Sequence, residues 1–247
     1  MLAITNLLLH GIDNPNIDHG NSLLHDVLDY TERDKFDKIL MNPPYGGSEK
    51  KDVMSHFPDD LFMSVILYRL KANGRAAVVL PDGFLFGTDN TKVNIKKKLM
   101  AECDLHTIIR LPGSVFAPYT SITTNILFFD RTHPTEKTWF YRLDMPEGYK
   151  HFSKTKPMRL EHFDPVKAWW DDRREILEGD FPKAKCYTTD EIAAGGYNLD
   201  LCGFPHEEEE ILEPMGLIQK YQEQRKSLND DIDKILARIT AKLEETE

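Results

Sequence analysis

Short apolar segments alternate with helical patterns over the first two thirds of the chain. Four segments have the length and apolar content of strands: Phe36–Met41, Arg75–Leu80, Leu105–Leu111 and Ile122–Phe129. Between them, apolar residues at helical spacing predict one helix that starts after Pro58 and ends by Gly74, and a second over Asp89–Glu102. This alternation predicts an α/β domain with a mainly parallel sheet and one antiparallel arm.

The pattern also predicts how these elements are buried. Phe36–Met41 is expected to be a short buried strand, and Arg75–Leu80 is apolar enough for a parallel strand covered on both faces. The lysines at 96–98 are expected to point largely outward, as a solvated face or, less commonly, as a phosphate contact. Thr138–Arg142 fits an antiparallel strand or a hairpin arm. Met1–His10 fits the tail of an amphipathic helix.

The last third of the chain has a different character. After Glu161 the pattern loosens, and small elements are expected to wrap the preceding domain. The chain ends in a charged helix with apolar residues in steps of four and three, at Leu228, Ile232, Ile235 and Ile239. That spacing predicts a helix-packing seam. We therefore expect a domain over residues 1–160, a wrapping or connecting segment over 161–205 and a C-terminal helix over 206–247.

The candidate chemistry lies directly after the first strand, at Asn42-Pro43-Pro44-Tyr45. Two consecutive prolines end hydrogen-bonded structure because neither carries an N–H group. Gly46-Gly47 then predicts a flexible turn in the backbone. The result is a stiff elbow at the carboxyl end of a strand, where open α/β sheets bind their ligands.

This elbow suits a flat heterocycle with an exocyclic amino group. The side-chain oxygen of Asn42 and the carbonyl of Pro43 can accept its two hydrogens, and Tyr45 can stack on the ring. The alternative is a plain strand-to-loop turn with a half-exposed tyrosine. The position between an apolar strand and a glycine pair favours binding.

Composition narrows the class of protein. The 247 residues contain 40% hydrophobic residues, no apolar run of membrane-spanning length and no signal-peptide pattern. Cys103, Cys186 and Cys202 lack paired or metal-type spacing, which indicates reduced thiols in a cytoplasmic protein. The nine histidines form no cluster, so no metal is expected. A net charge of −10 argues against DNA binding by this chain unaided.

Several sequence blocks resemble one family. "FDKILMNPPYGG" is similar to the catalytic motif of DNA methyltransferases that make N6-methyladenine. "GRAAVVLPDGFLFG", "LHTIIRLPGSVFAPYTSITTNILFFDR", "WFYRLDMPEGY" and "YNLD" resemble the modification subunit of type I restriction–modification systems. The resemblance implies a Rossmann-like sheet, S-adenosylmethionine as cofactor, and DNA, a specificity subunit and a restriction subunit as partners. It also implies adenine-specific methyl transfer with Asn42, Pro43, Pro44 and Tyr45 as catalytic residues.

The resemblance implies further site residues. Asn21 and Ser22 lie at the turn where the family usually has an acidic residue that contacts the cofactor, although a plain Gly-Asn turn explains them equally well. Phe116 and Tyr119 are candidates for a contact with the target base, or for packing. The C-terminal seam would meet helices of the specificity subunit.

One family motif is missing. No glycine-rich GxG loop joins a strand to a helix, and in the resembled fold that loop lies upstream, so the sheet is expected to be incomplete at its N-terminus. The isolated chain is then expected neither to bind the cofactor nor to methylate DNA. Either Met1–Leu23 or another chain should cover the edge of Phe36–Met41. Two alternatives stay open: a non-catalytic assembly module, and a methyltransferase acting on protein glutamine or RNA.

Overall fold

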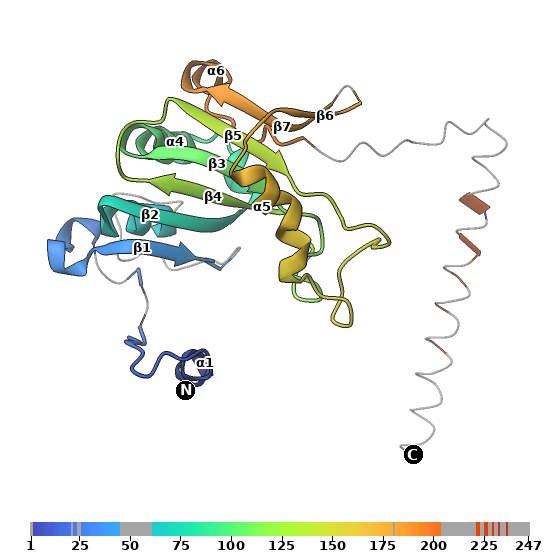
Figure 1. The fold of residues 1–247 in the computed structure, drawn as a ribbon, viewed down its shortest axis with the longest axis horizontal. Helices are drawn as coiled ribbons and strands as arrows, with labels where there is room; N and C mark the ends of the chain where they lie inside the picture. The colour runs from blue at the N-terminus through green and yellow to red at the C-terminus, as the bar shows by residue number, and fades with distance from the viewer. Residues whose placement is uncertain are drawn as a thin grey trace. The chain divides into compact units, whose positions relative to one another are not determined.

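The computed structural model describes residues 2–20, 22–23, 26–44, 61–179, 181–203 and single positions between Tyr221 and Leu236. The chain divides into two compact units, Met1–Pro205 and His206–Glu247. The first unit contains the sheet and the helices that pack on it (Figure 1). In the second unit only Ile232 of the predicted seam lies among the described residues, and its side chain is 53% exposed.

In the described part of the chain, seven strands form one sheet in the order β1-β2-β4-β3-β5-β7-β6 (Figure 1). The strands are β1 (Phe36–Met41), β2 (Leu70–Pro81), β3 (Asp104–Arg110), β4 (Thr124–Asp130), β5 (Lys137–Arg142), β6 (Ile176–Glu178) and β7 (Phe181–Thr188). The β1–β2 and β3–β5 pairs are parallel, and the other pairs are antiparallel. Strands β4 and β7 therefore run against the rest.

The predicted α/β class is confirmed, with two differences in strand direction. Two strands, and not one arm, run against the sheet. The expected antiparallel strand, β5, is antiparallel to β7 but parallel to β3. The direction of β5 is explained by the connection over residues 131–136, which passes the start of β3. There Thr135 accepts a hydrogen bond of 2.8 Å from the N–H of Leu105. β5 therefore begins where β4 ended and runs parallel to β3.

The helices cover the two faces of the sheet unequally. They are α1 (Leu2–Leu9), α2 (Leu61–Arg69), α3 (Asp82–Leu85), α4 (Asn90–Glu102), α5 (Asp164–Trp170) and α6 (Thr189–Ala194), with 3-10 turns at η1 (Val27–Asp29), η2 (Glu32–Asp34) and η3 (Leu160–Phe163). The main core joins Ile66 of α2 and Leu99 of α4 to one face. On the opposite face, α5 packs Val166 and Trp169 against β3 and β5 (Figure 1).

The expectations that β1 is a buried strand and that β2 is covered on both faces are wrong. In β1 only Ile39 is buried, while the side chain of Leu40 is 86% exposed. In β2 the buried residues alternate with Arg75, which is exposed, and Ala77, which is half-buried. Successive side chains of a strand point to opposite faces. One face of these two strands therefore packs on α2 and α4, while Leu40, Arg75 and Ala77 on the other face are exposed or half-buried.

Two local predictions also need correction. Gly74 does not end a helix, because α2 ends at Arg69 and Gly74 lies within β2. A Cβ atom there would lie 2.8 Å from the carbonyl oxygen of Lys71 in β2 and 3.1 Å from that of Asp37 in β1, so the backbone around Gly74 leaves no room for a side chain. Lys96 does not point outward. It is fully buried, and its Nζ donates hydrogen bonds to the carbonyls of Leu85, the last residue of α3, and of Gly87.

Residues before β1 pack on α2. α1 contains no buried residue, whereas Leu23 and Val27 are buried together with Val65 of α2. The buried contacts that this segment makes among the described residues are therefore on the α2 side of the sheet.

Candidate functional site

The candidate site lies at the edge of the sheet where β1, β2 and β3 end. Because these strands share one direction, their carboxyl ends meet at the same edge. β1 is followed by Asn42 and β2 by Asp82, while β3 ends at Arg110, opposite Asn125 at the start of β4. The elbow and a group of polar side chains thus occupy one edge.

The elbow itself is anchored through one proline. Pro43 is buried, whereas Asn42 and Pro44 on either side of it are exposed. Burial of the middle residue holds the backbone of the elbow, and Asn42 beside it is exposed. Tyr45, the predicted stacking residue, lies outside the described residues, as does the glycine pair after it.

A buried guanidinium organises the neighbouring part of the edge. Arg110 is 2% exposed, and its Nη1 donates a hydrogen bond of 2.7 Å to the carbonyl of Gly203. Its Nη2 donates to Asp82 at 3.1 Å and also pairs with Asp200. Asn125 donates a 2.6 Å hydrogen bond to the same Asp82 oxygen. This cluster joins β2, β3 and β4 to the segment that ends at residue 203.

Sequence reasoning missed this cluster. In the sequence, Asp82 and Asp200 stand out only as members of the blocks "GRAAVVLPDGFLFG" and "YNLD". The usable signal was positional: charged residues end or follow two otherwise apolar strands, so they should meet at one edge of the sheet. The pairing with Asp200, 90 residues further along, has no local signal.

Phe116 and Tyr119 lie in the loop between β3 and β4. Tyr119 is 92% exposed and Phe116 is half-buried; the N–H of Tyr119 donates to the Phe116 carbonyl at 2.9 Å. The loop leaves the same edge as the elbow, but β2 and β4 lie between. Three strand spacings correspond to about 14 Å. The structure thus brings these aromatics to the same edge of the sheet as the elbow, about 14 Å along it from the strand that Asn42 follows.

The two residues predicted to contact the cofactor, Asn21 and Ser22, precede β1 in the chain. Asn21 lies outside the described residues. Ser22 is exposed, and its carbonyl accepts a 3.4 Å hydrogen bond from the hydroxyl of Tyr30, next to the buried cluster of Leu23 on α2. Among the described residues, these contacts build no enclosed polar site, so the residues present do not by themselves fit S-adenosylmethionine.

Other chemistry is limited in the described part of the chain. It contains no group of three or more His, Cys, Asp or Glu side chains arranged to bind a metal ion, and no helix in it is long and apolar enough to cross a membrane. The three cysteines are unpaired with one another. Burial raises the pKa of Cys103 to about 11 and that of Cys202 to about 12, so both thiols are protonated at neutral pH.

An α/β sheet with Asn-Pro-Pro at the carboxyl end of an outer strand resembles the Rossmann-like methyltransferases that act on amino groups. The comparison with known families specifies this further. Residues 1–211 match the model of the N-6 DNA Methylase family, and the chain belongs to that family. The resemblance derived from the sequence blocks is confirmed.

Several relatives are methylase or modification subunits of type I restriction enzymes. The chain is 41% identical over 242 residues to the type I restriction enzyme EcoEI methylase subunit of Escherichia coli, covering 93% of this chain and 49% of the relative. A crystal structure of a modification subunit assigned to a type I restriction enzyme of Vibrio vulnificus YJ016 matches with 40% identity and a TM-score of 0.71, over 86% of this chain and 47% of that one. A chain from a study of type I complex assembly matches with 29% identity and a TM-score of 0.72, over 95% and 51%. This chain spans about half the length of each.

Proposed function

We propose that this chain carries the base-binding elbow of an adenine-N6 DNA methyltransferase and acts as part of a type I modification subunit. The observation that carries this proposal is the anchored elbow: an exposed Asn42 amide beside a buried Pro43, at the carboxyl end of β1. Membership of the N-6 DNA Methylase family supports adenine as the target. The reaction is methyl transfer from S-adenosylmethionine to the N6 amino group.

The elbow would act by positioning. Chemistry on a base requires it to leave the stack, so the adenine is flipped toward the edge of the sheet. Asn42 Oδ1 and the carbonyl of Pro43 then accept both hydrogens of the amino group, and Tyr45 stacks on the ring. The nitrogen lone pair is thereby directed away from the elbow. The methylated nitrogen is acidic and loses its proton to water, so no side chain is needed as a strong base.

The cofactor would be bound by the rest of the subunit. Ser22 is exposed on the α2 side of the sheet, and no glycine-rich loop is present in the sequence. We therefore propose that the isolated chain neither binds S-adenosylmethionine well nor methylates DNA. Calorimetry with the isolated chain tests this: no heat of binding at micromolar cofactor is expected. Micromolar affinity together with methyl transfer would show that the cofactor site lies within these residues.

DNA would reach the elbow through partner subunits. Phosphate contacts supply most of the affinity for DNA, and a chain with a net charge of −10 supplies few of them. We propose that a specificity subunit meets the C-terminal seam and that a restriction subunit joins the complex. Changing Ile232 and Ile235 to Glu should then abolish co-purification with a specificity subunit. Unchanged co-purification would assign the seam to packing within the chain.

The alternatives make different predictions about product. A non-catalytic assembly module would transfer no methyl group even in a complete subunit. A protein-glutamine or RNA methyltransferase would leave DNA unmodified. The similarity to modification subunits of restriction enzymes favours methylation of DNA over both alternatives.

Substitution of the elbow tests the proposal. Asn42→Ala or Tyr45→Ala, in a complete subunit that contains this sequence, should reduce kcat at least about 100-fold, which corresponds to about 2.7 kcal/mol of transition-state stabilisation. Asn94→Ala is the matched control, because Asn94 is an exposed asparagine on α4. Turnover of the Asn42→Ala variant equal to that of the control would refute the role of the elbow.

A further inference from the structure

The segment between β5 and η3 is strongly basic. Residues 149–159 contain four cations and no Asp or Glu, in a chain whose net charge is −10. The nearest carboxylates in the sequence are those of Glu147 and Glu161. The four cations are all exposed, and they are Lys150, Lys154, Lys156 and Arg159. Residues 149–159, the basic loop, are thus a local concentration of positive charge on an acidic chain.

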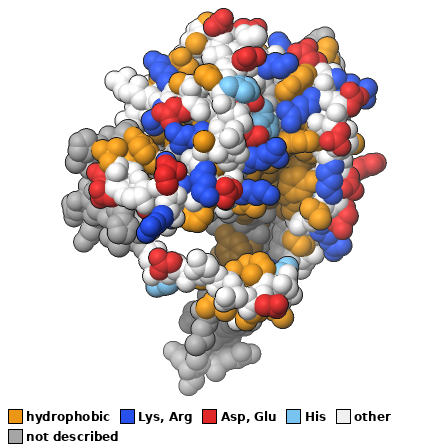
Figure 2. All heavy atoms as spheres, turned by 60° about the vertical axis from the view of Figure 1, so that its left-hand side comes forward, with side chains coloured by type: hydrophobic (Ala, Val, Ile, Leu, Met, Phe, Trp, Pro, Cys, Tyr) orange, Lys and Arg blue, Asp and Glu red, His pale blue; other side chains and the backbone are white. Residues whose placement is uncertain are grey.

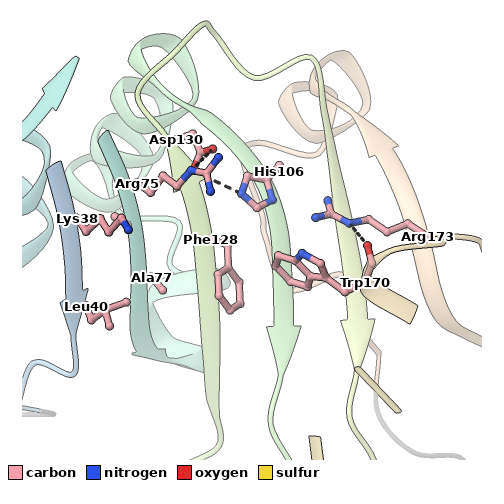
Figure 3. Close-up of a pocket in the computed structure, with 10 residues that line it drawn as sticks. Lys38, Leu40, Arg75, Ala77, His106, Phe128, Asp130, Trp170 and Arg173 are labelled. Carbon is pink, nitrogen blue, oxygen red and sulfur yellow. Dashed lines mark hydrogen bonds and ion pairs between the residues drawn. The ribbon is translucent and has the colours of Figure 1, made fainter. Parts of the chain in front are cut away.

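The cations of the basic loop differ from several basic side chains elsewhere in having no carboxylate partner. On the face shown in Figure 2, Lys and Arg side chains are interspersed with Asp and Glu. In the pocket shown in Figure 3, the Nε of Arg75 lies 3.4 Å from a carboxylate oxygen of Asp130. In the described part of the chain, by contrast, none of the four cations of the basic loop forms an ion pair. Their charge is therefore available to an anion outside the chain.

The backbone of the basic loop is held in place by its own contacts. Phe152 is buried, and its ring lies beside those of Tyr149 and His162, with centroids 5.6 Å and 5.5 Å away. Ser153 and Lys156 form a tight turn, because the N–H of each donates to the carbonyl of the other, at 3.0 Å and 3.2 Å. An ordered base of this kind reduces the entropy that is lost when the cations bind a ligand.

The basic loop leaves the carboxyl edge of the sheet. β5 is parallel to β3, and β3 shares its direction with β1, so the chain after β5 emerges at the same edge as the elbow (Figure 1). The N–H of Phe152 donates a 2.8 Å hydrogen bond to Ser114 Oγ, in the loop that carries Phe116 and Tyr119. That loop contains no charged residue over 111–123. Along this edge, the elbow is therefore followed by an uncharged aromatic loop and then by the basic loop.

We propose that the basic loop binds backbone phosphates of the DNA duplex on one side of the flipped adenine. β5 lies four strand spacings from β1, which is on the order of 19 Å. For a duplex that lies along this edge, with about 3.4 Å per base pair, the loop would meet phosphates about six base pairs from the elbow.

Phosphate contacts fix the register of a protein on a duplex without reading its sequence. The basic loop would therefore position the duplex, while the elbow binds the base. This inference deepens the proposed function and rests on it, because it takes DNA as the substrate.

DNA binding at several salt concentrations tests the basic loop. The protein is a complete modification subunit that contains this sequence, together with its specificity subunit, and the probe is a fluorescent DNA duplex without S-adenosylmethionine. Lys154→Gln with Lys156→Gln should weaken binding at least about tenfold at about 0.1 M salt. The slope of log affinity against log salt concentration should become shallower by about two, because each phosphate contact contributes ~0.9 to it.

A double variant at the other edge of the sheet is the matched control. Arg33→Gln with Lys137→Gln also removes two exposed cations, one just before β1 and one at the start of β5. Binding and salt slope should stay near those of the wild type in this control. A slope of the Lys154 and Lys156 variant equal to that of the control would overturn the proposal.

Two further measurements distinguish a protein partner and a catalytic role. Co-purification of the loop variant with the specificity subunit should be unchanged; its loss would assign the basic loop to an acidic surface of that subunit and overturn the proposal. The loop variant should raise KM for DNA and leave kcat near wild type, whereas a lower kcat with unchanged DNA binding would overturn a phosphate contact. Because the binding assay contains no cofactor, its outcome is independent of methyl transfer, so failure of the basic loop and failure of the elbow are distinguishable.

Discussion

The polar cluster around Arg110 gives the sharpest test of how the carboxyl edge is held together. Arg110→Gln removes a cation that is 2% exposed, while Asp82 and Asp200 keep their charges with side chains 18% and 20% exposed. Removing one partner of a buried ion pair costs ~3–5 kcal/mol. Because Gln retains one donor and water partly reaches the carboxylates, we expect a loss of about 3 kcal/mol in the free energy of unfolding.

Urea denaturation measures this loss. The fluorescence of Trp139 and Trp169, which pack edge to face at 5.8 Å, reports unfolding of the sheet. Arg75→Gln is the matched control, because Arg75 is 74% exposed in its ion pair with Asp130. A pair of that kind contributes up to about 1 kcal/mol. Equal losses in the two variants would refute the view that Arg110 fixes the edge.

Three further predictions concern Lys96, Cys202 and the thiols. Lys96→Met should lower the free energy of unfolding by ~1–3 kcal/mol, because the Nζ of Lys96 donates 2.9 Å hydrogen bonds to the carbonyls of Leu85 and Gly87. Lys97→Met, at an exposed position, should change the free energy of unfolding little. Equal effects of the two substitutions would contradict a structural role of the buried amine. Burial raises the pKa of Cys202 from 9.0 to about 12, so the folded state keeps the proton more tightly. The stability that this thiol contributes is complete below pH 9.0 and is lost as the pH rises toward 12. The urea midpoint should therefore fall between pH 8 and pH 10, and it should fall less steeply in Cys202→Ala. An identical pH dependence in the two proteins would contradict this contribution of Cys202. A thiol reagent at pH 8 should modify the half-buried Cys186 in the native chain before Cys103 and Cys202, and simultaneous modification of all three would be inconsistent with their burial.

Elements with a strong local pattern could be predicted from the sequence. The helix expected over Asp89–Glu102 is α4, and Asp89 caps it by accepting a hydrogen bond from the N–H of Lys92 at 2.9 Å. The strand expected over Leu105–Leu111 is β3, shifted by one residue. Apolar content, spacing and a capping side chain are local properties, so the sequence specifies them directly.

Features that depend on distant neighbours could not be predicted. Apolar content cannot distinguish a strand covered on both faces from one covered on a single face, which is why Leu40 was expected to be buried. Lys96 is buried where the carbonyls of Leu85 and Gly87 accept hydrogen bonds from its Nζ, and a run of three lysines gives no sign of that. The site at the carboxyl edge could be predicted only in part. The elbow at Asn42 is a sequence motif, whereas the Arg110 cluster depends on the order of the strands.

The central claim is that the elbow at Asn42 presents the N6 amino group of adenine for methylation. The most direct measurement is mass spectrometry of nucleosides from DNA treated with a complete modification subunit that contains this sequence, its specificity subunit and S-adenosylmethionine labelled in the methyl group. Labelled N6-methyladenine is expected, and it should be lost in Asn42→Ala and retained in Asn94→Ala. Label on cytosine, on RNA or on protein glutamine, or undiminished N6-methyladenine in Asn42→Ala, would contradict this role of the elbow.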